Sequence, residues 1–297
     1  TAVSNIIHSL KLEPYDEILM TNHEYGALIR AWCSMSNKTG VRIVQQEIPI
    51  PLVSKEKFKN DFWSGVSDKT KVIFISHITS PTALIFPIKE IIQMAKSKGI
   101  LTIVDGAHVP GHIPLNINDL GCDFYTGALH KWLCMPKGTT FLYVKKAHQN
   151  WVLPTVTSWG DKGEDPGPSN FLKEFQWQGT NDLSSFLTVP SAINFYNKHI
   201  KQNKSECFLL ASEASLKFNE ILGTNRIYEG GKWIGQMVAH PLPKNAPEDL
   251  KDILLKDFKI EIPIFEWNGI RLIRASFQVY NDKNDLDSIV NALSSIF

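Results

Sequence analysis

The side chains that could do chemistry in this 297-residue chain stand directly after its expected strands. In an open α/β sheet, ligands bind beyond the carboxyl ends of the strands, so groups at these positions meet at one edge of the sheet. The positions hold imidazoles, carboxylates, hydroxyls and a lysine, which are the side chains that acid–base and covalent catalysis use. In chain order they are Asn22, His23, Glu24, Tyr25, His77, Thr79, Ser80, Asp105, His108, His130 and Lys131.

Asp105 and Lys131 form the most informative pair among these residues. A pyridoxal cofactor needs a lysine that forms an imine with its aldehyde, and a carboxylate that keeps its ring nitrogen protonated so that the ring accepts electrons. Two strand ends of one sheet can face both sides of such a flat ring. The lysine must spend part of its time uncharged, which a desolvated pocket favours. Alone, Asp105 could be a helix N-cap and Lys131 a surface lysine, so the prediction depends on the pair.

The elements that position these groups are short strands alternating with helix-period segments over residues 17–146. This βαβ pattern is typical of a mainly parallel sheet covered by helices, joined by right-handed crossovers. One intervening helix has apolar residues at helical spacing from Ile88 to Ala95, and Gly99 ends it. The expected strands are EILM (17–20), VRIV (41–44), KVIFISHI (71–78), ILTIV (100–104) and TTFLYV (139–144), and His130 and Lys131 follow the segment DFYTGAL (123–129).

Two domains are expected from this organisation. Residues 1–183 form a large cofactor-binding domain, and residues 184–297 form a linking helix and a small C-terminal domain. The second part contains a long helical stretch over 184–222 and closes with the strand RLIRASF (271–277) and a helix. Residues 154–170 are rich in Gly, Pro, Ser and Asp, which predicts an irregular loop of the kind that often carries function.

Composition and charge exclude several classes of function. Lys plus Arg (31) nearly cancel Asp plus Glu (30), so no overall field attracts nucleic acid or an acidic membrane. No apolar run approaches the roughly 20 residues that span a bilayer, and the N-terminus lacks the basic-then-apolar-then-small pattern of a signal peptide. The four cysteines are scattered without a CxxC pair, which favours a reducing compartment, and we expect a cytoplasmic protein.

Two other enzyme classes and one binding function are alternatives to a pyridoxal enzyme. A nicotinamide-dependent oxidoreductase is disfavoured because no GxGxxG follows a strand. A zinc hydrolase would draw on His77, His108, His112 and His130, but Pro110 and Gly111 keep the second and third off one helix face, and HExxH is absent. No metal site is therefore expected. A catalytically silent homologue that acts as a binding protein is a further alternative, against which the presence of both Asp105 and Lys131 argues.

Taken together, the motifs resemble the class V aminotransferase family of pyridoxal-phosphate enzymes, and especially its isopenicillin N epimerase-like branch. The resemblance covers essentially the whole chain. It implies a fold type I α/β transferase, with a mainly parallel sheet that has helices on both faces and a smaller α+β C-terminal domain. The motifs that carry it are VDGAH (104–108), CDFYTGALHKW (122–132), NHEYGA (22–27), SHITSPTALIFP (76–87), WQGTND (177–182), IEIPIFEWNG (260–269) and IRASFQVYN (273–281).

Carried over by position, the resemblance implies a set of cofactor contacts. Lys131 would form the imine, Asp105 would pair with the pyridine nitrogen, and His23 would stack on the ring face. Ser80 or Thr79 would lie near the phenolic oxygen. His108 would sit beside the ring and His130 near the phosphate. A histidine at a strand end is, however, often a structural residue.

The cofactor phosphate needs fixed N–H donors, and a helix N-terminus provides them. Thr1 and Ala2, which open the first expected helix, fit this role, and the resemblance implies the same. It also implies that Gly179 and Thr180 reach the phosphate of a neighbouring subunit, and hence a homodimer. Without the resemblance, these two residues would be read as an ordinary turn.

Arg274 is the candidate for binding the carboxylate of an amino acid substrate. A planar guanidinium can donate two parallel hydrogen bonds to a carboxylate, a geometry that lysine cannot copy. The resemblance places such an arginine in the IRAS motif. Arg271, three residues earlier, is the competitor. It faces the opposite side of the strand, where we expect it to be solvated.

Three departures from the family pattern matter for function. Ala128 stands where the family usually has a hydroxyl or amide that bonds the phosphate. The chain starts at Thr1 with apolar residues already at helical spacing, so we expect it to begin inside a folded unit, without the N-terminal segment that in the family helps form the mouth of the site. Residues 258–273 hold no cysteine, which disfavours the cysteine desulfurase branch, and Cys122 and Cys134 look like core residues beside the lysine.

The motifs leave the reaction open. Transamination, β-elimination and racemisation all begin with imine exchange and removal of the α-proton. The sequence therefore predicts a pyridoxal-phosphate enzyme acting on the α-amino group or α-carbon of an amino acid, with an aminotransferase first, and a carbon–sulfur β-lyase or an epimerase-like racemase as alternatives.

Overall fold

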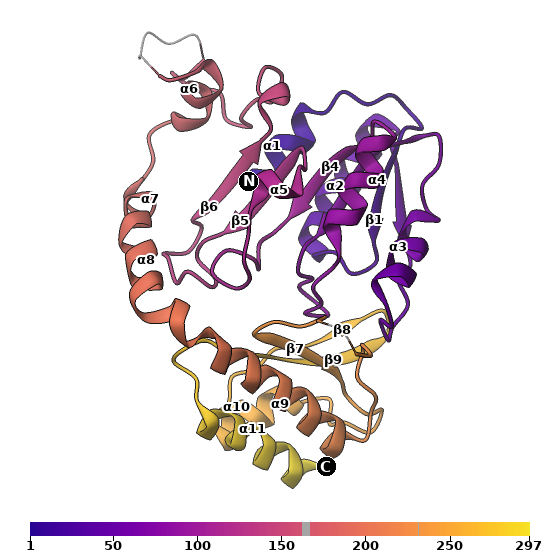
Figure 1. The fold of residues 1–297 in the computed structure, drawn as a ribbon, viewed down its shortest axis with the longest axis vertical. Coiled ribbons are helices and arrows are strands. Elements are labelled where there is room, and N and C mark those ends of the chain that lie inside the picture. The colour runs from indigo at the N-terminus through magenta and orange to yellow at the C-terminus, as the bar shows by residue number, and fades with distance from the viewer. Residues whose placement is uncertain (162–166, 231) are drawn as a thin grey trace.

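A six-stranded sheet and a three-stranded sheet follow one another along the long axis of the molecule (Figure 1). The computed structural model describes residues 1–161, 167–230 and 232–297. The larger sheet has the strand order β2-β1-β3-β4-β5-β6, in which all neighbours are parallel except β5 and β6. Its strands are β1 (Glu17–Thr21), β2 (Arg42–Gln46), β3 (Thr70–Ser76), β4 (Leu101–Asp105), β5 (Phe124–Ala128) and β6 (Thr140–Val144).

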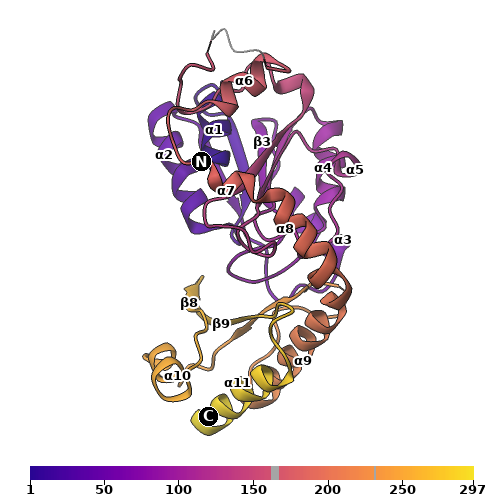
Figure 2. The same ribbon diagram turned by 90° about the vertical axis from the view of Figure 1, so that its left-hand side faces the viewer.

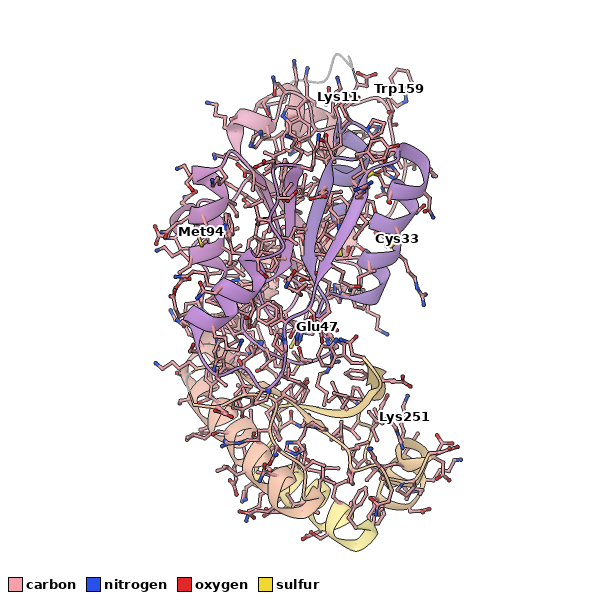
Figure 3. All side chains as sticks on the ribbon, turned by 90° about the vertical axis from the view of Figure 1, so that its right-hand side faces the viewer. Lys11, Cys33, Glu47, Met94, Trp159 and Lys251 are labelled. Carbon is pink, nitrogen blue, oxygen red and sulfur yellow. The ribbon has the colours of Figure 1, made fainter. Side chains whose placement is uncertain are left out.

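Helices cover both faces of the larger sheet, as the sequence predicted. Figure 2 shows α1 (Ala2–Ser9) and α2 (Gly26–Thr39) on one side, and α3 (Lys55–Trp63), α4 (Ile88–Ser97) and α5 (Ile117–Leu120) on the other. Cys33 on α2 and Met94 on α4 mark these two sides in Figure 3.

The central strand β3 shows why this sheet is buried on both faces. Val72 and Phe74 pack into the apolar cluster beneath α1 and α2, while Ile73 and Ile75 pack into the cluster beneath α3 and α4. Successive side chains of a strand point to opposite faces, so a strand covered twice must be apolar at every position. The continuous apolar run of β3 therefore reflects its position in the middle of the sheet, covered by helices on both faces.

The strand order reverses between β1 and β3, which fixes where a ligand can bind. The chain passes from β1 outward to β2, and then returns to β3 and continues in the opposite direction. Loops that leave the carboxyl ends of β1 and β3 diverge at this point and leave a crevice between them. The residues that follow β1, β3, β4 and β5 line the edge of the sheet at this crevice.

The expected helical stretch over 184–222 is not one helix. It consists of α7 (Ser184–Leu187), α8 (Val189–Phe195), a π-helical turn η2 (Tyr196–Ile200), a 3₁₀ turn η3 (Lys201–Asn203) and α9 (Lys204–Leu222). Pro190 explains the first break, because proline is accommodated in the first turn of a helix but not in its interior. The periodicity survives across these breaks, so the sequence pattern did not reveal them.

The loop predicted over 154–170 is followed by α6 (Asn170–Gln176), whose N-cap Ser169 accepts a hydrogen bond from the Leu172 amide. Residues 154–161 and 167–169 contain no helix or strand, as expected. Residues 162–166 lie outside the described part of the chain. A short 3₁₀ turn, η1 (Lys146–His148), ends the strand region before this loop.

The smaller sheet is antiparallel, with the order β7-β9-β8. It consists of β7 (Met237–Pro241), β8 (Ile264–Trp267) and β9 (Ile270–Ser276), and packs against α9, α10 (Leu250–Phe258) and α11 (Lys283–Ile296). The last helix begins at a capping box formed by Asp282 and Asp285, which satisfies its free amides. Its buried face is formed by Leu286, Ile289, Ala292 and Leu293.

Hydrogen bonds join the two halves of the molecule near the crevice. The backbone N–H of Gln236 donates to Nε2 of His112 over 2.6 Å. The side-chain Nε2 of Gln278 donates to the carbonyl oxygen of Trp132 over 3.0 Å. Trp233 packs into the core of the larger sheet. The division between residues 183 and 184 stays a prediction. No helix in the described ranges is long and apolar enough to cross a membrane.

Candidate active site

A cavity of about 250 Å³ lies at the carboxyl edge of the larger sheet. This volume is slightly below the roughly 300–1,000 Å³ of typical small-molecule sites, so the cavity suits a compact ring with one phosphate better than a dinucleotide. Seven residues expected at a cofactor site line it together: Thr1, Ala2, Ser80, Asp105, His108, His130 and Lys131.

Lys131 stands in the turn that follows β5, with its Nζ atom 3.0 Å from Nε2 of His108. Burial lowers the pKa of this lysine below its usual value; the negative charge of Asp105 opposes the shift, and Arg274 adds to it. A lysine with a lowered pKa is uncharged more often and can act as a nucleophile or a base. The chemistry predicted for Lys131 therefore fits its surroundings.

Asp105 ends β4 and lies buried at the floor of the cavity. Its Oδ1 accepts a hydrogen bond of 2.9 Å from the Ala107 amide, which fixes the carboxyl group. Burial raises the pKa of Asp105, while the Ala107 amide and Lys131 lower it. A protonated ring nitrogen placed here would supply the positive charge that this carboxylate lacks.

Gly106 allows the chain to leave β4 beside Tyr125. A Cβ atom at this glycine would lie 2.2 Å from the tyrosine ring, so no other residue fits without displacing the ring. The Tyr125 hydroxyl is also bonded to Nδ1 of His77 at 3.0 Å. The Asp-Gly pair is therefore held in place by packing as well as by hydrogen bonds.

The amino end of α1 forms another wall of the cavity. Thr1 is the N-cap of α1 and makes no side-chain capping bond, and Ala2 begins the helix. The amides in the first turn of a helix have no partner within it, and the helix dipole favours an anion there. Thr1 and Ala2 therefore meet the requirements of a phosphate site.

Ala128, the position that lacks the family's hydroxyl, lines this cavity and faces Thr140 across the β5–β6 ladder. Thr140 also lines the cavity. Directly opposite residues of antiparallel strands have Cβ atoms about 4.5–5.5 Å apart on one face of the sheet. Thr140 therefore has a hydroxyl on the side of the cavity where Ala128 has none. Nearby, Nδ1 of His130 is 3.1 Å from the carbonyl oxygen of Thr139.

His23 does not reach this cavity, so its expected place on the ring face is wrong. It is fully buried; Nδ1 lies 2.8 Å from Oγ1 of Thr82, and Nε2 lies 2.9 Å from the carbonyl oxygen of Ile48. Its ring packs 4.4 Å from that of Trp267, centroid to centroid. Because both ring nitrogens are engaged and the imidazole is enclosed, His23 is a structural residue, with a pKa lowered to about 4 by burial.

Tyr25, two residues later, lines the cavity instead and is 51% exposed. It is the N-cap of α2, directly at the turn that leaves the sheet edge. An aromatic ring at this place can lie against a flat ligand. A helix start placed at Gly26 would have identified Tyr25, rather than His23, as the residue at the mouth of the crevice.

The two hydroxyls proposed for the phenolic oxygen are distinguished by the structure. Thr79 is buried and its Oγ1 is 2.8 Å from Oγ1 of Thr82 and accepts a bond from the Leu84 amide. Ser80 lines the cavity. Only Ser80 is therefore placed to contact a ligand.

Glu24 is a buried carboxyl group behind the cavity wall, and the sequence assigned it no role. It accepts hydrogen bonds from Oγ1 of Thr21 at 2.7 Å and Oγ of Ser76 at 2.5 Å. Burial raises the pKa of Glu24 to about 7; the two hydroxyls lower it and Asp105 adds to the rise. Only the fold reveals this environment, because the partners are up to 52 residues away in sequence.

Arg274 and Arg271 also differ in their surroundings. One terminal nitrogen of Arg274 donates to two acceptors of Ser80, its carbonyl oxygen and, at 3.3 Å, its Oγ atom. The guanidinium lies 5.5 Å from the ring centroid of Phe265. Its buried Nε has no partner within the described residues. An unpaired buried donor is costly unless a ligand satisfies it.

Arg271 is not solvated as expected. It donates to the carbonyl oxygens of Ala246 at 2.9 Å and Pro247 at 2.8 Å, and so anchors the segment before α10. Both of its terminal nitrogens are therefore occupied by the protein. Of the two arginines, Arg274 has the donor left for a carboxylate.

Gly179 and Thr180 do not line the cavity of their own chain. Gly179 has φ +91°, in the region that favours glycine, and Thr180 is exposed. Both lie between α6 and α7, on the surface.

The histidines of the zinc alternative are used elsewhere. His77 bonds Tyr125, and His112 bonds the carbonyl oxygen of His108 and the Gln236 amide. Across the residues that the structure describes, no group of three or more His, Cys, Asp or Glu side chains could hold a metal ion.

Residues 1–289 match the model of the family Aminotransferase class-V, and the chain belongs to this family. It is therefore a pyridoxal-phosphate-dependent enzyme. The donor set fits that cofactor, because the cavity combines an amine with a lowered pKa, a buried carboxyl group and a helix N-terminus.

Sequence relatives include an isopenicillin N epimerase of Amycolatopsis lactamdurans, 28% identical over 94% of this chain and 74% of the relative. A probable chloroplastic L-cysteine desulfhydrase of Arabidopsis thaliana is 26% identical over 95% of this chain and 64% of the relative. Among solved structures, the Escherichia coli cysteine desulfurase CsdA superposes with a TM-score of 0.83 at 19% identity, covering 99% of this chain and 76% of that one. This likeness is in keeping with the fold type I architecture that the sequence predicted.

Proposed function

We propose that this enzyme removes the α-proton of an amino acid with Lys131 as the base, and that carbon–sulfur β-elimination is its reaction. The observation that carries the first part is the contact of Lys131 Nζ with His108 in a cavity that also contains Asp105. When bound, the cofactor would supply an electron sink for the negative charge that develops at the α-carbon.

Each protein group has a distinct part in this proposal. Asp105 would pair with the ring nitrogen and keep it protonated. Arg274 orients the substrate carboxylate through its free Nε and a terminal nitrogen. Lys131 would accept the α-proton at Nζ and hold it next to the β-carbon, where a departing thiolate can take it.

The choice of β-elimination is supported by the relatives named L-cysteine desulfhydrase, which recur among the similar proteins of plants. Persulfide chemistry, as the name cysteine desulfurase implies, has less support, because none of the residues that line the cavity is a cysteine. Cys122 is buried, and burial raises the pKa of its thiol to about 12, which leaves it unreactive.

Epimerisation is the second candidate, supported by the 28% identity with two isopenicillin N epimerases. It needs a proton returned to the opposite face of the α-carbon. His108 and Tyr25 both line the cavity and could supply it. Transamination, the reaction first expected from the sequence, uses the same base and requires a keto acid acceptor.

Reductive labelling tests the proposed lysine. Borohydride treatment of the cofactor-loaded protein should leave the cofactor permanently attached to Lys131, identified by peptide mapping. Lys131→Ala should abolish both the attachment and the visible absorbance of bound cofactor. Lys137→Ala, an exposed lysine of the same loop, is the matched control and should change neither. Attachment to any other lysine would refute the assignment.

A product assay in deuterated water distinguishes the reactions. With L-cysteine and no keto acid, β-elimination yields pyruvate, ammonia and hydrogen sulfide. Transfer of the amino group only in the presence of a keto acid would identify an aminotransferase instead. Inversion with deuterium at the α-carbon, and no net product, would identify an epimerase.

We also propose that the enzyme works as a homodimer in the cytoplasm. The segment from α6 to α8 exposes large apolar side chains, which mark an interaction surface in soluble proteins. Gly179 and Thr180 lie in the middle of this segment, where they could reach the phosphate of a second subunit. All four cysteines are free, which is in keeping with a reducing compartment. The exposed apolar side chains are Leu172, Trp177, Leu183, Phe186, Leu187, Ile193 and Phe195.

Light scattering during gel filtration tests the dimer, which Leu187→Glu at the exposed face should dissociate. Leu209→Glu, on α9, is the matched control, because Leu209 is 69% exposed and Leu187 is 78% exposed. A monomeric wild-type protein with full activity would refute the shared site.

A further inference from the structure

The indole of Trp132 contacts His108 on the side opposite to Lys131. Nε1 of Trp132 lies 3.4 Å from Nδ1 of His108, and Nε2 of His108 lies 3.0 Å from Nζ of Lys131. Tryptophan is only 7% exposed here, so water does not compete for its N–H. The three side chains form a line from the apolar core to the cavity.

The chemistry of these groups restricts where the hydrogens can be. An indole N–H only donates, so Nδ1 of His108 must accept. His108 is neutral, because burial holds its pKa well below the usual value, and nearby positive charge acts in the same direction. A neutral imidazole has one donor and one acceptor nitrogen, so the hydrogen is on Nε2 and points towards Lys131.

A hydrogen on Nε2 has a consequence for the lysine. An ammonium group has three donors and no lone pair, so it cannot accept this hydrogen. An uncharged amine can. The contact between His108 and Lys131 therefore stabilises the amine form and opposes the ammonium form.

We propose that Trp132 is a positioning residue that fixes the Nε2–H tautomer of His108 and thereby selects the uncharged, nucleophilic form of Lys131. The inference deepens the proposed function and depends on it for the role of the lysine. The tautomer itself is a property of the protein without cofactor.

Trp132 and His108 are held so that the tautomer is fixed rather than averaged. The Trp132 ring packs 4.1 Å from the His112 ring, and its carbonyl oxygen accepts the bond from Gln278. His112 Nε2 accepts from the Gln236 amide, so its hydrogen is on Nδ1 and is donated to the carbonyl oxygen of His108 over 3.0 Å. Backbone and side chain of His108 are thus both fixed.

The other charged groups around the pair do not replace this effect. Asp105 favours the ammonium form of Lys131, whereas burial and Arg274 favour the amine. Arg274, His112 and His130 act on His108 in the same direction as Lys131, towards the neutral imidazole. None of them determines which ring nitrogen has the hydrogen; among the described residues, the contact with Trp132 does.

The tautomer can be measured directly by ¹⁵N NMR of histidine-labelled, cofactor-free protein, with His108 assigned from a His108→Gln variant. We expect Nε2 to have the shift of a protonated nitrogen and Nδ1 that of an unprotonated one. The opposite tautomer, or an imidazolium at neutral pH, would overturn the proposal. Because this measurement needs no cofactor, it is independent of whether borohydride labels Lys131.

A second measurement follows the amine itself. The rate at which Lys131 of the cofactor-free protein reacts with acetic anhydride, as a function of pH, reports its uncharged fraction. Trp132→Phe keeps an aromatic ring but removes the N–H, so His108 can present a lone pair to an ammonium group. We expect acylation of Lys131 at pH 8 to slow about 2- to 10-fold, the range that one net hydrogen bond corresponds to, with the pH profile displaced upwards.

Trp32→Phe is the matched control for loss of a buried indole. Nε1 of Trp32 is buried without a partner in the described residues, on the opposite face of the sheet. It should leave the rate unchanged. A Trp132→Phe protein with native circular dichroism and the wild-type profile would refute the proposal. If that variant does not fold, the tautomer of the wild-type protein decides.

Discussion

Ser76 donates a hydrogen bond of 2.5 Å to Oε2 of Glu24 and forms the register pair of Asp105 across β3 and β4. Ser76 also lines the cavity. A second carboxyl group therefore stands directly behind the one that would hold the ring nitrogen. The negative charge of Asp105 adds to the rise in the pKa of Glu24, because like charges this close in a buried place repel.

Glu24 should make the stability of the protein depend on pH. Its pKa rises from a usual 4.5 to about 7 in the fold, so the folded state binds more protons than the unfolded state between these values. Stability therefore falls as pH rises through this window, by at most about 3 kcal/mol at about 1.36 kcal/mol per pKa unit. Glu24→Gln should unfold at higher urea at pH 8 and show a flatter dependence over pH 5–8. An unchanged pH dependence would show that Glu24 is ionised at little cost.

Asp105→Ala should bind pyridoxal phosphate more weakly and lose reaction at the α-carbon by several orders of magnitude, because an unprotonated ring is a poor electron sink. Titration of absorbance gives the affinity, and single-turnover kinetics give the rate. Asp119→Ala, on the exposed helix α5, is the control. A near-normal rate in the Asp105 variant would remove this residue from the mechanism.

Arg274→Lys should raise KM for the amino acid by roughly 10- to 100-fold, since it loses charge-assisted hydrogen bonds of about 1.5–3 kcal/mol. The visible spectrum of bound cofactor should not change. Arg271→Lys is the matched comparison. It should lower the melting temperature by freeing the Ala246 and Pro247 carbonyls, and leave KM unaltered. The reverse pattern would exchange the roles of the two arginines.

Thr140 should compensate for the missing hydroxyl at Ala128. Thr140→Val should weaken binding of pyridoxal phosphate by roughly 0.5–1.5 kcal/mol, or somewhat more if the bond is to the charged phosphate. Ala128→Ser should strengthen binding by a similar amount. The double variant should return to near the wild-type affinity if the two hydroxyls replace one another. Equal affinity in all four proteins would mean that neither contacts the phosphate.

The sequence predicted the parallel sheet and the cluster at its edge because both depend on local patterns. Strand periodicity determines where each strand ends, and the rule that parallel strand ends share an edge then brings Asp105 and Lys131 together. The prediction that His23 stacks on the cofactor ring was wrong because it used only the position of His23 after a strand. The sequence does not show that Trp267, from the smaller sheet, packs against the His23 ring. The same limit concealed Tyr25, whose place depends on where α2 begins.

The hydrogen-bond partners of site residues were not predictable for a related reason. Trp132 and His108 are 24 residues apart, and the contact depends on the curvature of two loops that no periodicity describes. The segment after residue 184 failed differently. Its apolar period continues through the breaks at Pro190 and at the π-helical turn, so pattern alone reads a single helix.

The bonds from Gln278 to Trp132 and from Gln236 to His112 mean that the two lobes are not interchangeable modules. Both glutamines belong to the C-terminal lobe, and both act on the residues that hold His108 beside Lys131. A chimaera that joins the N-terminal lobe of this enzyme to the C-terminal lobe of a relative would receive the relative's substrate-binding arginine. It would also change the hydrogen bonds to Trp132 and His112, and with them the position of His108 beside Lys131. Exchanging specificity by recombination between family members would require that the new lobe keep the Gln278 side chain and a backbone N–H at position 236 that reaches His112.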